Sequence, residues 1–195
     1  EVKKFIRYVK IYGLRRALYK AAGRKRVGHS AYFSGNLKNR PRRVGVIGCG
    51  QFAFASLGAM LEMYAPARFA RSYDINKGAQ QSFETFFGIT KTTIDVADIC
   101  NDVSIDTVYV VSNHATHAGY AVQLIKAGKV AYVEKPLAAS WKQLSELTHL
   151  VGADFRKIYC GYNRPFSAAI GQLKEMCTAA EAPLTLNFYI VGHFL

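Results

Sequence analysis

Three small residues at fixed spacing, Gly48, Gly50 and Ala53, form the most chemically informative group in the sequence. They follow the apolar run 44–47 and precede a helical pattern, so a Gly-x-Gly-x-x-Ala motif opens a helix directly after a strand. The first glycine permits the turn, the second lets a phosphate approach the backbone, and the small third residue lets helix and strand pack closely. N–H groups at the helix start then bind the phosphate charge. The residues predicted to hold a dinucleotide phosphate are Gly48, Gly50, Gln51, Phe52 and Ala53.

An acidic residue stands where the second half of a dinucleotide motif requires one. Asp74 ends a run of strand-forming residues, 24 residues after Gly50. Its carboxylate accepts hydrogen bonds from adenine-ribose hydroxyls and repels a 2′-phosphate, so NAD is the predicted cofactor. The nearby Lys77 keeps NADP open as an alternative. A structural alternative also remains, in which Asp74 only caps the following helix.

The segments that must position these residues alternate between strand and helix. Repeated strand-helix units with short connections predict an α/β fold with a doubly wound parallel sheet, the Rossmann arrangement. The stretch TVYVVS, residues 107–112, is the most strand-like and has the character of a strand buried on both faces. Strands are expected over 43–48, 68–73, 107–112, 130–134 and 157–160, with a weak one over 90–94. Helices are expected over 51–64, 76–87, 116–127 and 140–151, with a short one that Asp95 caps and that ends near Asn101.

Composition excludes several classes of protein. The chain has 195 residues, half of them apolar, and no apolar run of the roughly 18 to 20 residues that a membrane span needs. Its four cysteines lie far apart without paired metal-ligand spacing, which favours reduced thiols. We therefore expect a globular, soluble protein of the cytoplasm without a metal site. The cysteines are Cys49, Cys100, Cys160 and Cys177.

The net charge of +13 belongs to residues 1–43, nearly all of it to an N-terminal arm, residues 1–42. Residues 1–43 carry fourteen Lys and Arg against Glu1, whereas residues 44–195 carry twelve charges of each sign. The arm predicts a basic amphipathic helix of about five turns followed by a linker. Such a helix suits an anionic membrane surface or nucleic acid. The alternative is a helix that packs on its own domain or on a preceding one, and the neutral remainder of the chain argues against nucleic acid.

Two further stretches, SNHATHAGYAVQLIKAGKVAYVEKPLA at 112–138 and GYNRPFS at 161–167, extend the pattern. Together with the glycine motif they resemble the Gfo/Idh/MocA family of NAD(P)-dependent sugar and polyol oxidoreductases, over about residues 43–195. The resemblance implies that the nicotinamide lies near Ser112, Asn113 and His114. Most members have Thr-Pro-Asn at these positions, so the cofactor contact of the family asparagine falls here on His114.

The same resemblance implies that Lys135, in the sequence Glu-Lys-Pro, faces the reacting carbon. Oxidation of a secondary alcohol requires removal of the hydroxyl proton, and a partly desolvated lysine with a lowered pKa is a usable base. Glu134 is expected to bind ribose or substrate, or to orient Lys135. His117 matches a family cofactor position, and an alternative role is to satisfy a local backbone group. Asn163 and Arg164 either contact substrate or cofactor, or hold their own loop.

The C-terminal part predicts the beginning of a second domain. Residues 167–180 have a helical pattern, and residues 183–195 alternate as a strand with one buried face. In the family this is the first strand of an antiparallel substrate-binding sheet. We therefore expect three segments, 1–42, 43–165 and 166–195. The sequence predicts an N-terminal fragment of an oxidoreductase acting on a sugar, nucleotide-sugar or cyclitol, a homo-oligomer in its full-length form. The alternative is a dinucleotide-binding regulatory module without catalysis.

Overall fold

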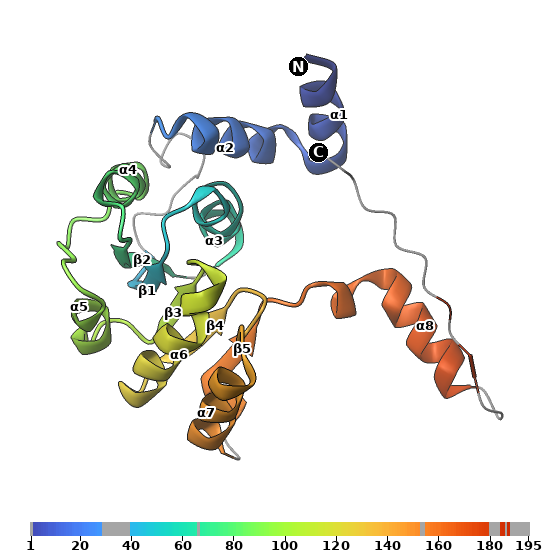
Figure 1. Cartoon of the computed structure of the whole chain (residues 1–195). Coiled ribbons are helices and arrows are strands. Elements are labelled where there is room, and N and C mark those ends of the chain that lie inside the picture. The colour runs from blue at the N-terminus through green and yellow to red at the C-terminus, as the bar shows by residue number, and fades with distance from the viewer. Residues whose placement is uncertain are drawn as a thin grey trace. The chain divides into compact units, whose positions relative to one another are not determined.

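A five-stranded parallel sheet organises the chain in the computed structural model, which describes residues 2–28, 40–65, 67–152, 155–179, 184, 185 and 187. Every strand pair is parallel and the strand order is β2-β1-β3-β4-β5, which confirms the predicted doubly wound α/β fold (Figure 1). The strands are β1 (Arg42–Ile47), β2 (Arg68–Tyr73), β3 (Thr107–Val110), β4 (Val130–Val133) and β5 (Ile158–Cys160).

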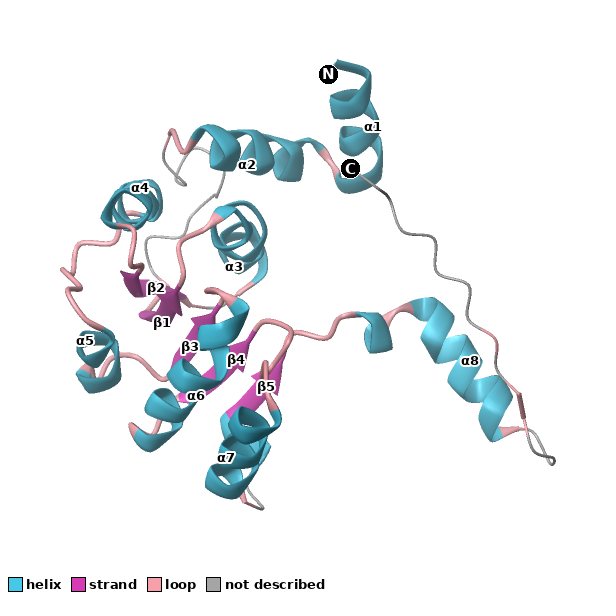
Figure 2. Cartoon of the chain, in the orientation of Figure 1, coloured by secondary structure: helices cyan, strands magenta, loops and turns pink. Residues whose placement is uncertain are grey.

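Helices cover both faces of this sheet (Figure 2). One apolar cluster lies between β1 and β2 and the helices on one face of the sheet. A second cluster lies between the sheet, mainly β3 and β4, and the helices on the opposite face. Burial of apolar side chains on both faces is what stabilises a parallel sheet. The first group comprises η2 (Ala53–Leu57), which is one π-helical turn, α3 (Gly58–Tyr64) and α4 (Lys77–Phe87). The second comprises α5 (Val96–Asn101), α6 (His117–Lys126) and α7 (Trp141–Val151).

Side-chain caps fix where the helices begin. The side chain of Asn76 accepts a hydrogen bond from the N–H of Ala79 at the start of α4. Asp95 caps α5 within a capping box, as the sequence predicts, and Ser140 caps α7. Such caps satisfy N–H groups that have no partner inside the helix.

The weak strand expected over 90–94 is wrong, because this segment forms a loop. Its backbone groups bond to side chains instead of to another strand. Gln80 Nε2 and the Arg71 guanidinium donate to the carbonyls of Thr93 and Thr92, and the carboxylate of Asp98 accepts from the N–H of Ile94. With these groups already satisfied, residues 90–94 have no need of a strand partner.

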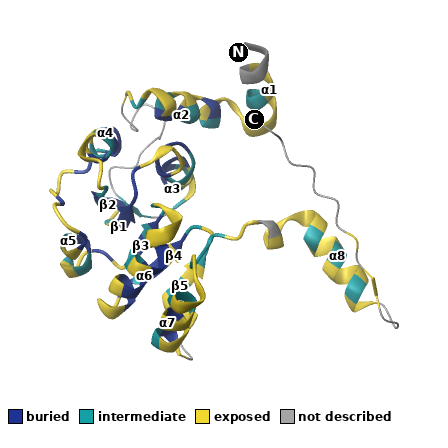
Figure 3. Cartoon of the chain, viewed as in Figure 1, coloured by how far each residue is buried: buried dark blue, intermediate teal, exposed yellow. Residues whose placement is uncertain are grey.

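The N-terminal segment contains two helices, so the prediction of one continuous helix is wrong. Gly13, with φ of 84°, separates α1 (Val2–Tyr12) from α2 (Leu14–Lys25). One side of α2 is buried against the sheet domain, where Tyr19 is fully buried and its ring packs edge-on against Phe86 with centroids 6.1 Å apart (Figure 3). This packing supports the alternative of a helix that lies on its own domain.

The chain divides into two compact units, residues 1–161 and 162–195. The second unit contains η5 (Arg164–Phe166) and α8 (Ala168–Thr178), which Ser167 caps. The helix expected over 167–180 therefore forms, whereas the strand expected over 183–195 falls almost entirely outside the described residues. Among the helices that the structure describes, none is long and apolar enough to cross a membrane.

Candidate functional site

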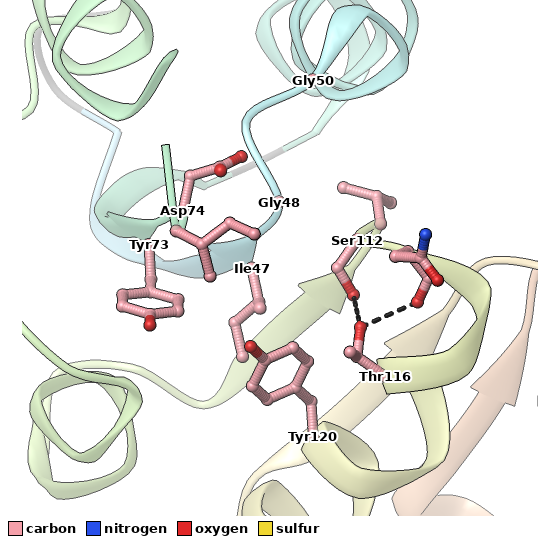
Figure 4. A pocket seen from close by; sticks show the side chains of 11 residues that line it. Ile47, Gly48, Gly50, Tyr73, Asp74, Ser112, Thr116 and Tyr120 are labelled. Atoms are coloured by element: carbon pink, nitrogen blue, oxygen red, sulfur yellow. Dashed lines mark hydrogen bonds between the residues drawn. The ribbon is translucent and has the colours of Figure 1, made fainter. Parts of the chain in front are cut away.

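A pocket of about 280 Å³ opens at the carboxyl ends of β1 and β3. The chain that leaves β1 passes to helices on one face of the sheet, and the chain that leaves β3 passes to helices on the other face. The two connections therefore leave a crevice between them, which is where ligands bind in doubly wound sheets. Eleven residues line the pocket, and they come from the loop after β1, the end of β2 and the segment after β3 (Figure 4). The sequence motifs predicted for the cofactor therefore meet at one place.

Gly48 makes the turn after β1 and has no substitute there. Its φ is 98°, and a Cβ at this position would lie 2.7 Å from backbone atoms of Val111 and Ser112. The N–H of Gly48 donates to the carbonyl of Tyr73 at 2.8 Å, which ties the turn to the end of β2. Both the positive φ and the close backbone contact require glycine.

Gly50 and the helix start carry N–H groups that could bind a phosphate. Gly50 lines the pocket, and a Cβ added to it would meet no atom within 4 Å. The first bond of the helix runs from the N–H of Phe54 to the carbonyl of Gly50, at 3.0 Å, which leaves the preceding N–H groups without an intrahelical acceptor. The side chains of Gln51 and Phe52 are exposed and Ala53 is fully buried, so all three would contribute through the backbone or through close packing.

Asp74 holds the glycine-rich loop from the end of β2. Its Oδ2 accepts from the N–H of Cys49 at 2.6 Å, and its Oδ1 accepts from the N–H of Asn76 at 2.8 Å. The cap of α4 is Asn76 and not Asp74, so the structure argues against the capping alternative. A carboxylate has about four lone-pair sites, so Asp74 can still accept hydrogen bonds from ribose hydroxyls.

The segment after β3 forms the opposite wall of the pocket. Ser112, Asn113 and Thr116 line it, and a hydrogen bond of 2.8 Å joins the Ser112 and Thr116 hydroxyls (Figure 4). Thr116 is a site residue that the sequence analysis missed, although its place four residues after Ser112 at a helix start is a usable signal. His114, in the short helix η3 (His114–Thr116), is exposed and does not belong to the lining.

His117 lies behind the pocket wall. It is only 1% exposed, and its two ring nitrogens lie 2.8 Å from the carbonyl oxygen of Pro136 and 3.2 Å from that of Ser112. These contacts connect the segment after β3 with the turn after β4. The structure therefore supports the alternative in which His117 satisfies local backbone groups.

Glu134, predicted for cofactor binding, and Lys135, predicted for catalysis, do not line this pocket. Glu134 and Lys135 follow β4, and Glu134 Oε2 accepts from the N–H of Lys135 at 2.9 Å. Lys135 is exposed, so the described residues do not provide the desolvation expected for its ammonium group. Asn163 and Arg164 belong to the second compact unit. Of the predicted cofactor residues, the structure brings Gly48, Gly50, Asp74, Ser112 and Asn113 together around the pocket.

Two tyrosines that the sequence analysis missed form an aromatic side of the pocket. Tyr73 and Tyr120 line it, with ring centroids 6.5 Å apart (Figure 4). Burial, followed by the neighbouring Tyr73 and Asp74, raises the pKa of Tyr120. In the loop, burial and then the charge of Asp74 raise the pKa of Cys49 to about 12. Burial therefore favours the neutral form of both groups.

The pocket carries the groups that one half of a dinucleotide requires. Its volume of about 280 Å³ is close to the lower end of the range for small-ligand sites, roughly 300 Å³. Asp74 lies where the adenine ribose would bind, and the donors before Phe54 lie where a pyrophosphate would bind.

Comparison with known proteins supports this assignment. Residues 42–162 match the profile of an oxidoreductase family with an NAD-binding Rossmann fold, which is the Gfo/Idh/MocA family. The chain is 28% identical over 138 residues to inositol 2-dehydrogenase 3 of Saccharopolyspora erythraea and 30% identical over 141 residues to inositol 2-dehydrogenase 1 of the same organism. These matches cover 70% and 71% of this chain but 40% and 42% of those enzymes.

A solved structure of a dehydrogenase is also similar to this chain. The myo-inositol dehydrogenase of Lactobacillus casei, determined with NAD(H) and myo-inositol, aligns with a TM-score of 0.65 at 25% identity, over 71% of this chain and 41% of that one. The chain thus spans about two fifths of the length of the relatives it matches. The family profile covers well over half of the chain, including the glycine loop, Asp74 and the segment after β3. The protein belongs to the Gfo/Idh/MocA oxidoreductase family with an NAD-binding Rossmann fold.

Proposed function

We propose that residues 42–162 bind NAD and form the cofactor half of an oxidoreductase that interconverts a secondary alcohol and a carbonyl of a cyclitol or related sugar. The observation that carries the proposal is the pairing of Asp74 with the glycine-rich loop at the edge of β1 and β3. The cyclitol class rests on the inositol dehydrogenases among its relatives. Because the chain spans about two fifths of those enzymes, the substrate itself is assigned only by class.

The charges around the ribose end of the pocket favour NAD over NADP. The carboxylate of Asp74 would lie beside a 2′-phosphate and repel it. Lys77, the nearest alternative partner in the sequence, donates to Gln80 Oε1 at 3.2 Å and to the carbonyl of Ile94 at 3.3 Å, and its Nζ lies 4.9 Å from the centre of the Tyr73 ring. These contacts engage its ammonium group, so Asp74 sets the preference.

Lys135 is our candidate for the proton transfer. Bound NAD supplies the hydride acceptor, and a base must remove the hydroxyl proton of the alcohol. β3 and β4 are parallel neighbours with Val110 opposite Val133, so Ser112 and Lys135 follow their strands at the same edge of the sheet. In the role we propose, Lys135 exchanges a proton with the substrate oxygen, and Glu134 orients it through the N–H of their shared peptide bond.

Calorimetric titration of the chain with NAD and NADP tests the cofactor assignment. We expect NAD to bind at least about tenfold more tightly than NADP, since repulsion of a phosphate by a nearby carboxylate exceeds about 1.4 kcal/mol. Asp74→Asn removes the charge and keeps one acceptor for the loop, so it should reduce the preference for NAD. Glu146→Gln, an equal change of charge on the exposed face of α7, is the matched control. A well-folded chain that binds neither dinucleotide would contradict the proposal.

Turnover separates the enzyme from the regulatory alternative. In the complete natural protein, Lys135→Met should lower kcat for cyclitol oxidation by at least about a hundredfold, which is the usual size of general acid-base catalysis. NAD affinity should stay unchanged, because Lys135 does not line the pocket. Undiminished turnover in Lys135→Met would remove the catalytic assignment and leave the cofactor assignment intact.

A further inference from the structure

An arginine from the N-terminal segment reaches the glycine-rich loop. Arg26 caps α2 and lies outside residues 42–162, which match the family profile. Its φ is 53° and its ψ is 39°, so it adopts the left-handed conformation, as no other non-glycine residue does among those described. Such a conformation is unfavourable for a residue with a side chain and persists where the surrounding contacts enforce it.

The docking of α2 gives Arg26 a fixed position. Gly23, one turn before it, packs so closely on η2 that a Cβ there would lie 2.9 Å from the Cβ of Ala55. Tyr19 is buried one turn further back, with its ring against Phe86 of α4. The end of α2 is therefore anchored on the elements that surround the loop.

The guanidinium group of Arg26 bridges the loop and α4. Nη2 donates to the carbonyl of Cys49 at 2.8 Å and to the carbonyl of Ala79 at 2.7 Å. Nε donates to the hydroxyl of Ser82 at 2.7 Å, and Cζ lies 5.0 Å from the centre of the Phe54 ring. A planar fork with several donors makes this arrangement specific to arginine.

The consequence for the loop follows from peptide geometry. The Cys49–Gly50 bond is trans, because Lys135–Pro136 is the one cis bond within the described ranges. In a trans peptide the C=O and the N–H point in opposite directions. When Arg26 holds the carbonyl of Cys49, it turns the N–H of Gly50 away from α2. Asp74 holds the N–H of Cys49 at the same time, so the residue between the two glycines is fixed on both sides.

We propose that Arg26 is a positioning residue of the dinucleotide site: it holds the Cys49 carbonyl so that the Gly50 N–H is oriented toward the cofactor phosphates. The proposal rests on the proposed function, because it assumes that a dinucleotide occupies this pocket. The proposal gives α2 a role in cofactor binding. This role does not depend on the basic charge of the N-terminal arm.

The test compares NAD affinity in two variants that remove the same charge. Arg26→Ala should weaken NAD binding by at least about tenfold, the value of a lost hydrogen bond from a charged donor. Arg24→Ala, which removes an exposed arginine from the last turn of α2, should change NAD affinity by less than about twofold because exposed charges contribute little. Equal affinities in the wild type and Arg26→Ala, or equal losses in both variants, would overturn the inference.

Chemical rescue separates positioning from general stabilisation. Ethylguanidinium, added below denaturing concentrations, should restore part of the NAD affinity of Arg26→Ala and leave that of Arg24→Ala unchanged. A loss of affinity that no added guanidinium restores, together with a lowered Tm, would mean that Arg26 only stabilises the fold, and this would overturn the inference.

A second variant keeps the test decisive if circular dichroism shows that Arg26→Ala does not fold. Arg26→Lys keeps the charge but lacks the fork that reaches Cys49, Ala79 and Ser82 together, so NAD affinity should fall by at least about threefold. Unchanged affinity in Arg26→Lys would overturn the inference. A wild-type chain that binds no dinucleotide would instead overturn the proposed function, and the inference with it.

Discussion

Gly48 and Gly50 lie two residues apart and have different tasks, which substitution can separate. Gly48→Ala forces a side chain into a φ of 98° and into the backbone of Val111, so we expect a loss of at least about 3 kcal/mol in the free energy of unfolding. Gly50→Ala meets no atom of the protein, so its stability should stay within about 0.5 kcal/mol of the wild type.

Gly50 is also expected to affect the binding of NAD. The Cβ of Gly50→Ala occupies space beside the phosphates, so NAD affinity should fall by at least about tenfold in a protein of normal stability. Urea denaturation and calorimetry measure the two effects. Normal NAD affinity in Gly50→Ala would contradict the phosphate-binding role of the loop.

The thiol of Cys49 makes the stability of the folded chain depend on pH. Burial, and then the charge of Asp74, raise its pKa from 9.0 to about 12 in the folded chain. The unfolded chain ionises first as the pH rises, so this stabilisation is complete below about pH 9 and is lost progressively between about pH 9 and 12. Cys49→Ala should therefore lose less stability than the wild type between pH 8 and pH 10. Parallel decreases in the two Tm curves would contradict this prediction.

At the residue scale, the sequence predicted the half of the site that glycine and Asp74 define. Their roles depend on local backbone geometry, which short motifs encode. It did not predict Tyr120 or Arg26, because their roles depend on contacts between distant segments. Thr116 was also missed, although its hydrogen bond to Ser112 is local.

At the scale of elements, α2 behaves as part of the sheet domain. Tyr19 is fully buried against Phe86, so Tyr19→Ala should lower the free energy of unfolding by about 3 to 5 kcal/mol, as for other large-to-small changes of buried aromatic residues. Leu14→Ala, on the exposed side of the same helix, should cost no more than about 0.5 kcal/mol. Urea denaturation measures both variants. Equal, small effects would mean that α2 is not part of the folded domain in solution.

The elements with strong patterns were predicted well, and the failures have physical causes. The strand β3 was found because an apolar, β-branched run is typical of a strand that is buried on both faces of a parallel sheet. Residues 90–94 look like a strand locally, yet side chains from α4 and β2 already satisfy their backbone groups. Gly13 divides the N-terminal helix through its positive φ, which an amphipathic pattern does not reveal.

At the scale of the whole molecule, one carboxylate outside the site stabilises the fold. Asp102 forms ion pairs with Arg71 at 2.8 Å and with Lys91 at 2.7 Å. Although burial opposes the shift, hydrogen bonds from Lys91, Ser104 and Arg71 hold the pKa of Asp102 well below its usual range. The unfolded chain therefore binds the proton more readily, so this stabilisation is present above pH 3.8 and is lost as the pH falls further.

Asp102→Asn makes this contribution measurable. The variant should lose about 1 to 3 kcal/mol at pH 7, the value of hydrogen bonds to a charged group. Its stability should also decrease less than that of the wild type between pH 5 and pH 2. Urea denaturation across this pH range provides the comparison, with Asp106→Asn as a control at a more exposed ion pair. The same acid dependence in all three proteins would contradict the role of Asp102.

The fold class could be predicted from the sequence, because the spacing of glycines, acid and strands reflects the architecture of the whole domain. The family was identified from the resemblance of residues 112–138 and 161–167 to its members. The geometry of the proton transfer proposed for Lys135 could not be read, because Lys135 does not line the cofactor pocket. The part that aligns with this chain is 40% to 41% of the length of the matching relatives.

The central claim is that NAD binds at the edge of β1 and β3, on the loop that Asp74 holds. Titration of the chain, labelled with ¹⁵N-glycine, with NAD tests this claim directly by NMR. The amide signals of Gly48 and Gly50 should shift with NAD concentration, whereas Gly128, which precedes β4 at the opposite edge of the sheet, should not change. NAD binding that leaves the Gly50 signal unchanged, or that shifts Gly128 equally, would contradict the account.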